Sequence, residues 1–178
     1  MAKIGHADPV NFDDIIYRFG GNDYIDAGSG HDVIDAGSGY DTIRGGTGWD
    51  EMTGGPGRDE FRFSTGDSGP SWDDADIIWD FLSAVDWISF DTIVGSPDTY
   101  FERSFQGDGT YSGTYNMALE LAKEDIGHYI DGDIFTVFYT DGYDGYLFAD
   151  TNFNGRVDTG IELRGLTDVS QFEWYDIH

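Results

Sequence analysis

Five aspartates in the N-terminal third of the chain recur at an interval of nine residues. They are Asp23, Asp32, Asp41, Asp50 and Asp59. A glycine stands two residues before each aspartate, and a large apolar residue stands two residues after it: Gly21, Gly30, Gly39, Gly48 and Gly57, and Ile25, Ile34, Ile43, Met52 and Phe61. An ordinary flexible linker has no reason to keep three residue types in phase. Regularly spaced carboxylates offer oxygen ligands, which hard divalent cations prefer.

The residues between the aspartates indicate which elements would position them. Glycine permits the positive φ angles of tight turns, and an apolar residue between two polar ones is typical of a very short strand with one side chain turned inward. We therefore predict alternating turns and strands, with the aspartates at the turns. Carboxylates about 4 Å apart repel each other by up to ~4 kcal/mol at an effective dielectric constant near 20. A bound cation is therefore predicted to decide whether this segment folds.

The pattern is similar to the nonapeptide G-G-x-G-x-D-x-U-x of the RTX family of calcium-binding parallel β-rolls. The resemblance implies that two repeats form one coil. Ile25, Ile43 and Phe61 would then stack in one sheet, and Ile34 and Met52 in the other. Asp23, Asp41 and Asp59 would line one edge, with Asp59 last in its ladder, and Asp32 and Asp50 would line the opposite edge.

The same resemblance implies Ca²⁺ as the ligand, with about three or more ions bound between stacked turns. The five aspartates would supply the carboxylates. Turn carbonyls would complete the sites, and the glycines expected to supply them or to shape the turns are Gly21, Gly28, Gly30, Gly37, Gly39, Gly46, Gly48, Gly55 and Gly57.

The nine-residue interval is lost after Phe63. The stretch "GGPGRDEFRFSTGDS" followed by "ADIIWDFLSAVDWISF" resembles the C-terminal domain of serralysin-type metalloproteases, and residues 146–172 resemble its closing hairpin and final strand. This resemblance, weak over residues 92–140, implies an all-β fold: a parallel β-roll capped by a mostly antiparallel β subdomain. We expect an N-terminal cap over 1–18, the roll over 19–63, and the capping subdomain with a type I secretion signal over 64–178.

The charge balance is strongly acidic: 35 Asp and Glu face 9 Lys and Arg, for a net charge of −26. Nucleic acids and anionic membranes are bound through basic patches, so neither is an expected partner. The start of the chain lacks the apolar core of a cleavable signal peptide, and no apolar stretch is long enough for a membrane span. The resemblance to the serralysin-type domain implies a secreted, extracellular module that is exported by the type I secretion machinery, and we expect it to fold on Ca²⁺ outside the cell.

No catalytic residue is predicted. The sequence has no His-Glu-x-x-His, and its four histidines are scattered, so a catalytic zinc site is not supported. Ser68 lies in "GDSGP", which is similar to the nucleophile segment of trypsin-like proteases, but we interpret it as a loop residue. The chain is expected to be no enzyme by itself, with a role as the C-terminal part of a larger secreted hydrolase left open. A small hydrolase in its own right is the least favoured alternative.

The loop "DTNFNGRVD" is a second candidate cation site. Asp150, Asn152, Asn154 and Asp158 match EF-hand positions 1, 3, 5 and 9. The glutamate required at position 12 is missing, because Ile161 stands there. The favoured alternative is a hairpin turn rich in Asp, Asn and Gly.

The aromatic residues allow a competing function, a calcium-scaffolded polysaccharide-binding or adhesion module similar to the accessory modules of alginate epimerases. Trp49 and Tyr143, the latter with Tyr139 and Tyr146 nearby, are the candidates for sugar contact. Four other aromatic side chains are expected to fill the core of the cap: Trp79, Phe81, Trp87 and Trp174.

Overall fold

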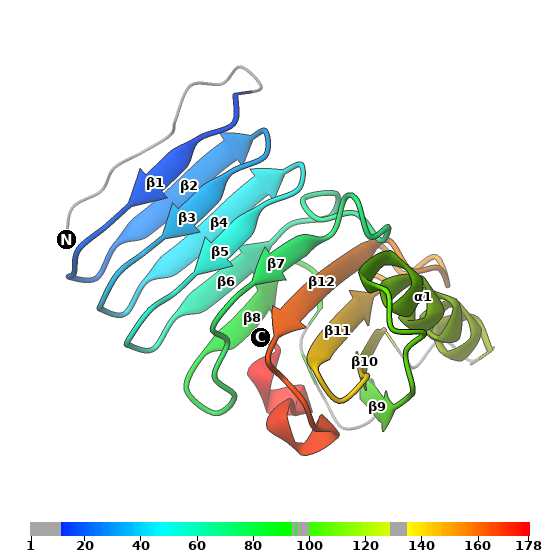
Figure 1. Cartoon of the computed structure of the whole chain (residues 1–178). Helices are drawn as coiled ribbons and strands as arrows, with labels where there is room; N and C mark the ends of the chain where they lie inside the picture. The colour runs from blue at the N-terminus through cyan, green and yellow to red at the C-terminus, as the bar shows by residue number, and fades with distance from the viewer. Residues whose placement is uncertain (1–11, 94, 96–99, 129–134) are drawn as a thin grey trace.

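The computed structural model describes residues 12–93, 95, 100–128 and 135–178, and most of the expected N-terminal cap, residues 1–11, lies outside them. In this part of the chain the strands form two sheets, drawn in Figure 1. The bounds are β1 Ile15–Tyr17, β2 Tyr24–Ser29, β3 Val33–Asp35, β4 Thr42–Thr47, β5 Glu51–Thr53, β6 Glu60–Phe63, β7 Asp76–Ile78, β8 Trp87–Phe90, β9 Tyr100–Ser104, α1 Tyr111–His128, β10 Thr136–Thr140, β11 Asp144–Ala149 and β12 Thr159–Arg164, followed by 3-10 turns at Val169–Gln171 and Trp174–Asp176.

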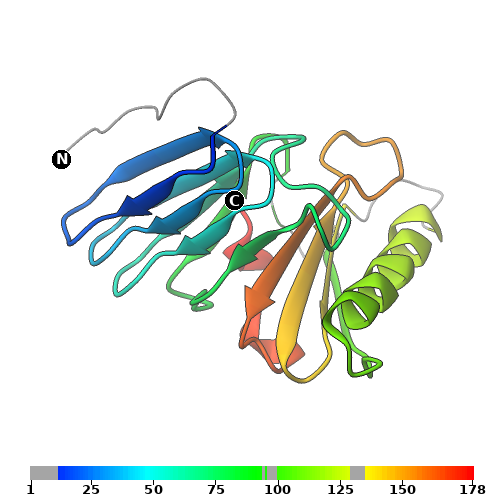
Figure 2. The same cartoon turned by 45° about the horizontal axis from the view of Figure 1, so that its top comes forward.

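The N-terminal half is a parallel β-roll whose odd-numbered and even-numbered strands lie in different sheets. The even strands pair in the order β2-β4-β6-β8, and the odd strands β1-β3-β5-β7 begin the larger sheet, so each coil contributes one strand to each. Figure 2 shows the two sheets facing each other with the turns stacked along their edges. The predicted parallel β-roll is confirmed.

The inward side chains stack as predicted. Ile25 pairs with Ile43 and Ile43 with Phe61 in the smaller sheet, and Ile34 pairs with Met52 in the larger one. All five are at most 2% exposed. The stacks continue past Phe63, because Phe61 pairs with Ile88 and Met52 with Ile78. Strand β1, in the segment expected as a cap, also pairs in register with β3.

The larger sheet changes direction beyond β7. Strand β12 is parallel to β7, while β12-β11 and β11-β10 are antiparallel, and β9 closes the sheet parallel to β10. One apolar core runs without a break from the roll into this cap, through Phe81, Phe138, Leu147 and Phe172 among others. Because two of the three strand pairs among β9–β12 are antiparallel, the predicted mostly antiparallel cap is confirmed.

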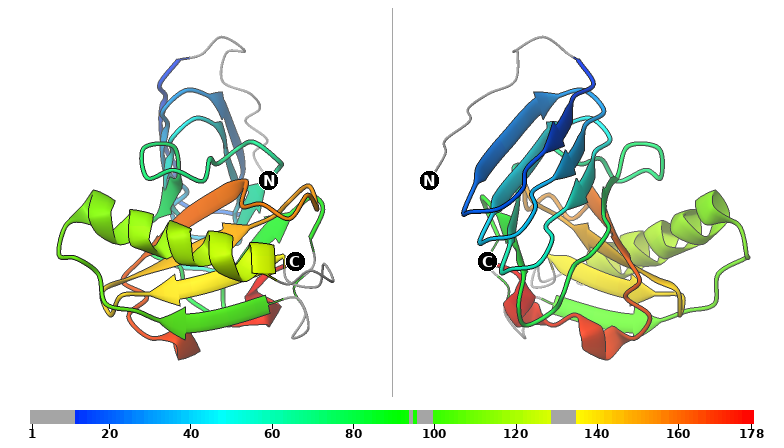
Figure 3. Two further views of the ribbon diagram at one scale, coloured as in Figure 1. Left: turned by 90° about the vertical axis from the view of Figure 1, so that its right-hand side faces the viewer. Right: turned by 60° about the vertical axis from the view of Figure 1, so that its left-hand side comes forward.

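Helix α1, by contrast, was not predicted. It lies across the outer face of the cap sheet, as the left view of Figure 3 shows. Its buried residues recur at helical spacing and pack on Tyr139, Tyr146 and Phe148 of that sheet: Tyr115, Ala118, Leu119, Ala122 and Ile126. This periodicity was present in the sequence, in the region where the family resemblance is weak. No helix in the described ranges has the length and apolarity needed to cross a bilayer.

Candidate metal centre

The predicted aspartates form two ladders, one along each edge of the roll. Each rung is a backbone N–H that donates to the Oδ1 of the aspartate 18 residues later. On one edge the Asp23 N–H donates to Asp41 Oδ1 at 2.8 Å, and the Asp41 N–H donates to Asp59 Oδ1 at 2.9 Å. On the other edge the Asp32 N–H donates to Asp50 Oδ1 at 2.8 Å. The sequence-based assignment of aspartates to edges agrees with this geometry.

Both ladders extend beyond the predicted set. Asp14 N–H donates to Asp32 Oδ1 at 2.7 Å, Asp50 N–H to Asp76 Oδ1 at 2.9 Å, and Asp59 N–H to Asp86 Oδ1 at 2.9 Å. The prediction that Asp59 ends its ladder was wrong. The later steps span 26 and 27 residues, because longer turns are inserted while the strand pairing stays in register. The signal in the sequence was a repeated Asp-x-apolar triplet at 76–78 and 86–88.

The second carboxylate oxygen of the ladder aspartates has a different environment. It is buried, and no hydrogen-bond donor reaches it among the described residues, at five positions: Asp32, Asp41, Asp50, Asp59 and Asp76. All five residues are at most 2% exposed. A buried ionised carboxylate without a partner costs several kcal/mol, so buried charges in proteins are normally paired or bound to metal. These residues therefore fit a cation.

The same burial raises the pKa values of the ladder aspartates. Loss of water contact is the main cause that raises the pKa of Asp50 to about 7 and the pKa of Asp59 to about 6, and repulsion from neighbouring aspartates adds to it. It also raises the pKa of Asp76 well above its ordinary value, and repulsion from Asp50 is the next largest cause. Desolvation likewise raises the pKa of Asp32, Asp41 and Asp86. Without a counter-ion, the folded roll resists ionisation of its own ladders.

The turn glycines bring successive turns into direct backbone contact. A methyl group added at Gly46 would overlap the carbonyl oxygen of Gly28, and one added at Gly48 would overlap that of Gly30. On the opposite edge Gly55 stacks in the same way on Gly37, and Gly57 on Gly39. Most of the predicted glycines have positive φ angles, between 85° and 141°: Gly21, Gly28, Gly30, Gly37, Gly46, Gly48 and Gly55. Carbonyl oxygens thus line the same stacked turns as the aspartates.

Side chains alone do not make a metal site here. In the described ranges no three His, Cys, Asp or Glu side chains gather closely enough to hold an ion. Any cation at the turns must therefore take main-chain carbonyls as well as carboxylates, which suits Ca²⁺ with its six to eight oxygen ligands. The chemistry such an ion supplies is charge compensation between neighbouring coils.

In the loop from Asp150 to Asp158, three of the four carboxylate oxygens accept hydrogen bonds from the loop itself, while Asp158 Oδ2 is buried without a donor among the described residues. Asp150 accepts from the N–H groups of Asn154 and Gly155 at 3.1 and 2.6 Å. Asp158 Oδ1 accepts from the N–H and hydroxyl of Thr151, at 2.9 and 2.5 Å. This pattern is that of a side-chain-stabilised hairpin turn. A cation at Asp150, Asn152, Asn154 and Asp158 remains a prediction.

Ser68 is fully buried and serves the fold. Its hydroxyl donates to the carbonyl of Gly160 at 2.6 Å and accepts the N–H of Asp76 at 2.8 Å. It thus stands where a further aspartate would continue the ladder beyond Asp76. This agrees with the interpretation of Ser68 as a loop residue rather than a nucleophile.

The aromatic side chains differ in part from expectation. Phe81 is buried, but Trp79 and Trp174 are 47% and 37% exposed and Trp87 is half-buried, so the prediction that they fill the core was wrong for these three. Tyr139 and Tyr146 are buried, which removes them from any sugar-contact set. Tyr143 is 76% exposed, and Trp49 is half-buried beside the ring of His31.

Comparison with known proteins agrees with the repeat geometry. A family model of the RTX calcium-binding nonapeptide repeat (4 copies) matches residues 11–34 and 27–61. No curated protein sequence matches the chain.

Among solved structures, the chain is similar to the AlgE6R3 subunit of the Azotobacter vinelandii mannuronan C5-epimerase. The two are 24% identical, with a TM-score of 0.58, over 97% of this chain and 86% of that one. The AlgE6R2 subunit of the same enzyme is also 24% identical, with a TM-score of 0.55, over 93% of this chain and 86% of that one. At this identity the likeness shows the fold. The chain therefore carries RTX calcium-binding nonapeptide repeats within a parallel β-roll.

Proposed function

We propose that this protein is a non-catalytic module that folds when Ca²⁺ binds between the stacked turns of its roll. The observation that carries the proposal is the set of buried, unpartnered carboxylate oxygens at Asp32, Asp41, Asp50, Asp59 and Asp76. Each of these oxygens destabilises the ion-free fold and favours the ion-bound one. Ca²⁺ held at 100 times its dissociation constant adds about 2.7 kcal/mol per site, so about three sites match the stability of an ordinary domain.

The proposed ligand set follows from the two ladders. The carboxylates would come from Asp23, Asp32, Asp41, Asp50 and Asp59, with Asp76 and Asp86 added by the structure. The carbonyls would come from glycines in the same turns, such as Gly28, Gly30 and Gly37, whose oxygens lie against the next coil.

A titration followed by circular dichroism tests the proposal. In EDTA the protein is expected to lose most of its β signal, and millimolar Ca²⁺ is expected to restore it cooperatively. Mg²⁺ at the same concentration should be a poor substitute, because it requires a smaller octahedral site. A β signal unchanged by EDTA, or restored equally by Mg²⁺, would contradict the proposal.

We further propose that the module is exported unfolded through a type I secretion system and folds outside the cell, where calcium is more concentrated. The charge of −26 supports this, because self-repulsion opposes compaction until cations neutralise it. Co-expression with a type I transporter should deliver the chain to the medium, and removal of the C-terminal residues should keep it inside. Equal export of both chains would count against this route.

A second candidate is a polysaccharide-binding module, either alone or as part of a larger secreted hydrolase. Its support is the fold shared with two subunits of a mannuronan C5-epimerase. Binding to soluble polysaccharides in the presence of Ca²⁺ separates this candidate from a module that only folds. If the module binds none of the polysaccharides, only the calcium-dependent folding function is supported.

A further inference from the structure

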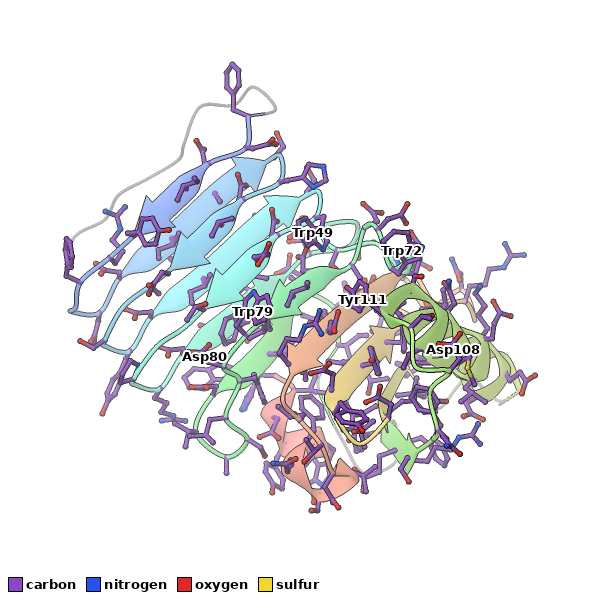
Figure 4. All side chains as sticks on the ribbon, viewed as in Figure 1. Trp49, Trp72, Trp79, Asp80, Asp108 and Tyr111 are labelled. Carbon is purple, nitrogen blue, oxygen red and sulfur yellow. The ribbon has the colours of Figure 1, made fainter. Side chains whose placement is uncertain are left out.

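Four side chains from three separate segments of the chain form a continuous row on the outer face of the larger sheet. Trp72 lies in the loop before β7, Trp79 directly follows β7, Tyr111 opens α1 and Arg164 ends β12. In Figure 4 the labelled rings of this row follow in the order Trp72, Tyr111, Trp79 over the region where β7 and β12 are paired. The Trp72 and Tyr111 rings are 6.3 Å apart in an edge-to-face arrangement.

Arg164 lies between Tyr111 and Trp79 and contacts both rings. Its guanidinium carbon lies 5.0 Å from the centre of the Tyr111 ring and 5.3 Å from the centre of the Trp79 ring. The guanidinium is itself fixed by two carboxylates, Asp144 at 2.9 Å and Glu162 at 3.0 Å. One cation therefore packs against both rings.

Hydrogen bonds to carboxylates hold two of the three rings, Trp79 and Tyr111, in place. The Trp79 indole N–H donates to Glu51 Oε2 at 2.9 Å, and the Tyr111 hydroxyl donates to Glu162 Oε2 at 2.6 Å. Glu162 is fully buried, so Tyr111 is anchored to the interior of the sheet. A surface whose side chains are ordered before binding loses little conformational entropy on binding.

The rings nevertheless remain open to solvent. Trp72 is 40% exposed, Trp79 47% and Tyr111 39%. Adjacent exposed aromatic residues held rigidly on a surface are unusual unless they contact a partner. Rigid, amphipathic rings also provide large contact areas at low entropic cost.

The charges around the row select the chemistry of the occupant. Arg164 is the cation of the row, and Asp144 and Glu162 neutralise it, while Glu51 adds a further negative charge beside Trp79. The whole chain carries −26. A polyanionic chain would be repelled from this face, whereas the C–H faces of uncharged sugar rings can stack on aromatic rings.

We propose that the row Trp72–Tyr111–Arg164–Trp79 is a binding platform for a neutral polysaccharide chain. This inference rests on the second proposed function and names its surface and ligand class. It differs from the sequence-based expectation, which pointed to Trp49 and Tyr143.

Affinity electrophoresis in Ca²⁺ tests the platform. The probes are four soluble neutral polysaccharides (hydroxyethylcellulose, arabinoxylan, galactomannan and dextran) and sodium alginate as the anionic comparison. At least one neutral polymer is expected to retard the protein, and alginate is expected to retard it less. Trp79→Ala and Trp72→Ala should each weaken binding about tenfold, as loss of an aromatic anchor does.

Tyr143→Ala is the matched control, because Tyr143 is 76% exposed but lies outside the row. Calcium-induced circular dichroism of every variant separates loss of binding from loss of folding. Retardation by none of the neutral polymers, stronger retardation by alginate, or equal binding by the tryptophan variants and Tyr143→Ala would overturn the platform. A normal calcium response alongside any of these results would leave the calcium-dependent folding proposal standing.

Discussion

Each ladder aspartate uses its two carboxylate oxygens differently. In Asp50, Oδ1 accepts the N–H of Asp32 from the preceding coil, while Oδ2 is buried without a donor. The first oxygen belongs to the fold and the second is available to a cation. A substitution that keeps the first oxygen and removes the charge therefore separates the two roles.

Asp50→Asn is expected to change the ion-free and calcium-bound proteins in opposite directions. The amide keeps an acceptor for Asp32 and removes a buried charge, so in EDTA at about pH 8 the variant should gain about 1–2 kcal/mol of unfolding free energy. It should also need more Ca²⁺ to fold. Circular dichroism in EDTA, where the variant should retain more β signal than the parent, and a calcium titration measure the two effects. Asp73→Asn, at an exposed position, is the control and should change neither the ion-free stability nor the calcium requirement. Destabilisation of the ion-free protein by Asp50→Asn would contradict this account.

The raised pKa values of Asp50 and Asp59 predict a pH dependence for the ion-free protein. Asp50, with a pKa of about 7, and Asp59, with a pKa of about 6, bind protons more tightly when folded than when unfolded. Their contribution to stability is therefore fully present below the ordinary pKa of 3.8 and is lost as the pH rises through 6 and 7.

Acidification should consequently stabilise the ion-free roll and weaken its calcium binding. In EDTA, the β signal in circular dichroism should be larger at about pH 5 than at about pH 8. The calcium concentration at the folding midpoint should be higher at about pH 5 than at about pH 8, because protons compete with Ca²⁺ for the carboxylates. Ion-free stability that falls on acidification would mean that the ladder carboxylates are not desolvated as described.

At the scale of elements, the roll depends on how closely its turns stack. Strands of three to six residues bury few side chains each. The turns therefore do more than connect strands, because their contacts set the spacing between coils and bring the ladder oxygens together.

Gly48→Ala is expected to prevent calcium-induced folding. Gly48 has a φ angle of 127°, and an added methyl group would overlap the Gly30 carbonyl of the neighbouring coil. Gly142→Ala is the control, because Gly142 has a φ angle of 91° but no atom within 4 Å of the added group. The control should cost only the ~1–2 kcal/mol of a left-handed residue. Equal calcium midpoints for the two variants would show that turn stacking does not matter.

At the scale of the whole molecule, the cap closes one end of the roll. Phe172 stacks on Phe138 with centroids 4.9 Å apart and lies 5.5 Å from Phe81. The C-terminal residues also pair with β8, since the His178 N–H donates to the Ile88 carbonyl at 2.8 Å. Repeat arrays need such closure, because a terminal coil otherwise exposes its apolar face.

Two truncations are expected to lose calcium-induced folding to different degrees. A chain that ends at Thr65 lacks Asp76 and Asp86, which accept the N–H groups of Asp50 and Asp59, and it should not fold in saturating Ca²⁺. A chain without residues 166–178 keeps both ladders but loses Phe172, so it should fold only at a much higher calcium concentration.

Tryptophan fluorescence and amide exchange during calcium titrations measure both truncations. Tyr175→Ala, at an exposed position in the same C-terminal segment, should leave the midpoint unchanged. A Thr65 truncation that folds at the full-length midpoint would show that calcium alone is sufficient and that the cap serves another purpose.

The sequence by itself determined which residues face inward and which lie at the turns, and its resemblance to the RTX family predicted the coil and the two edges on which the aspartates lie. It could do so because a nine-residue period repeats the same local chemistry, so Gly, Asp and an apolar residue each return to an equivalent position. Tertiary structure decided the continuation of the ladders to Asp76 and Asp86. The interval between aspartates changes there, but the parallel pairing of β5 with β7 and of β6 with β8 keeps the strands in register. Tertiary structure also decided the exposure of Trp79, because β12, far away in the sequence, places Arg164 against that ring and leaves its surface in solvent.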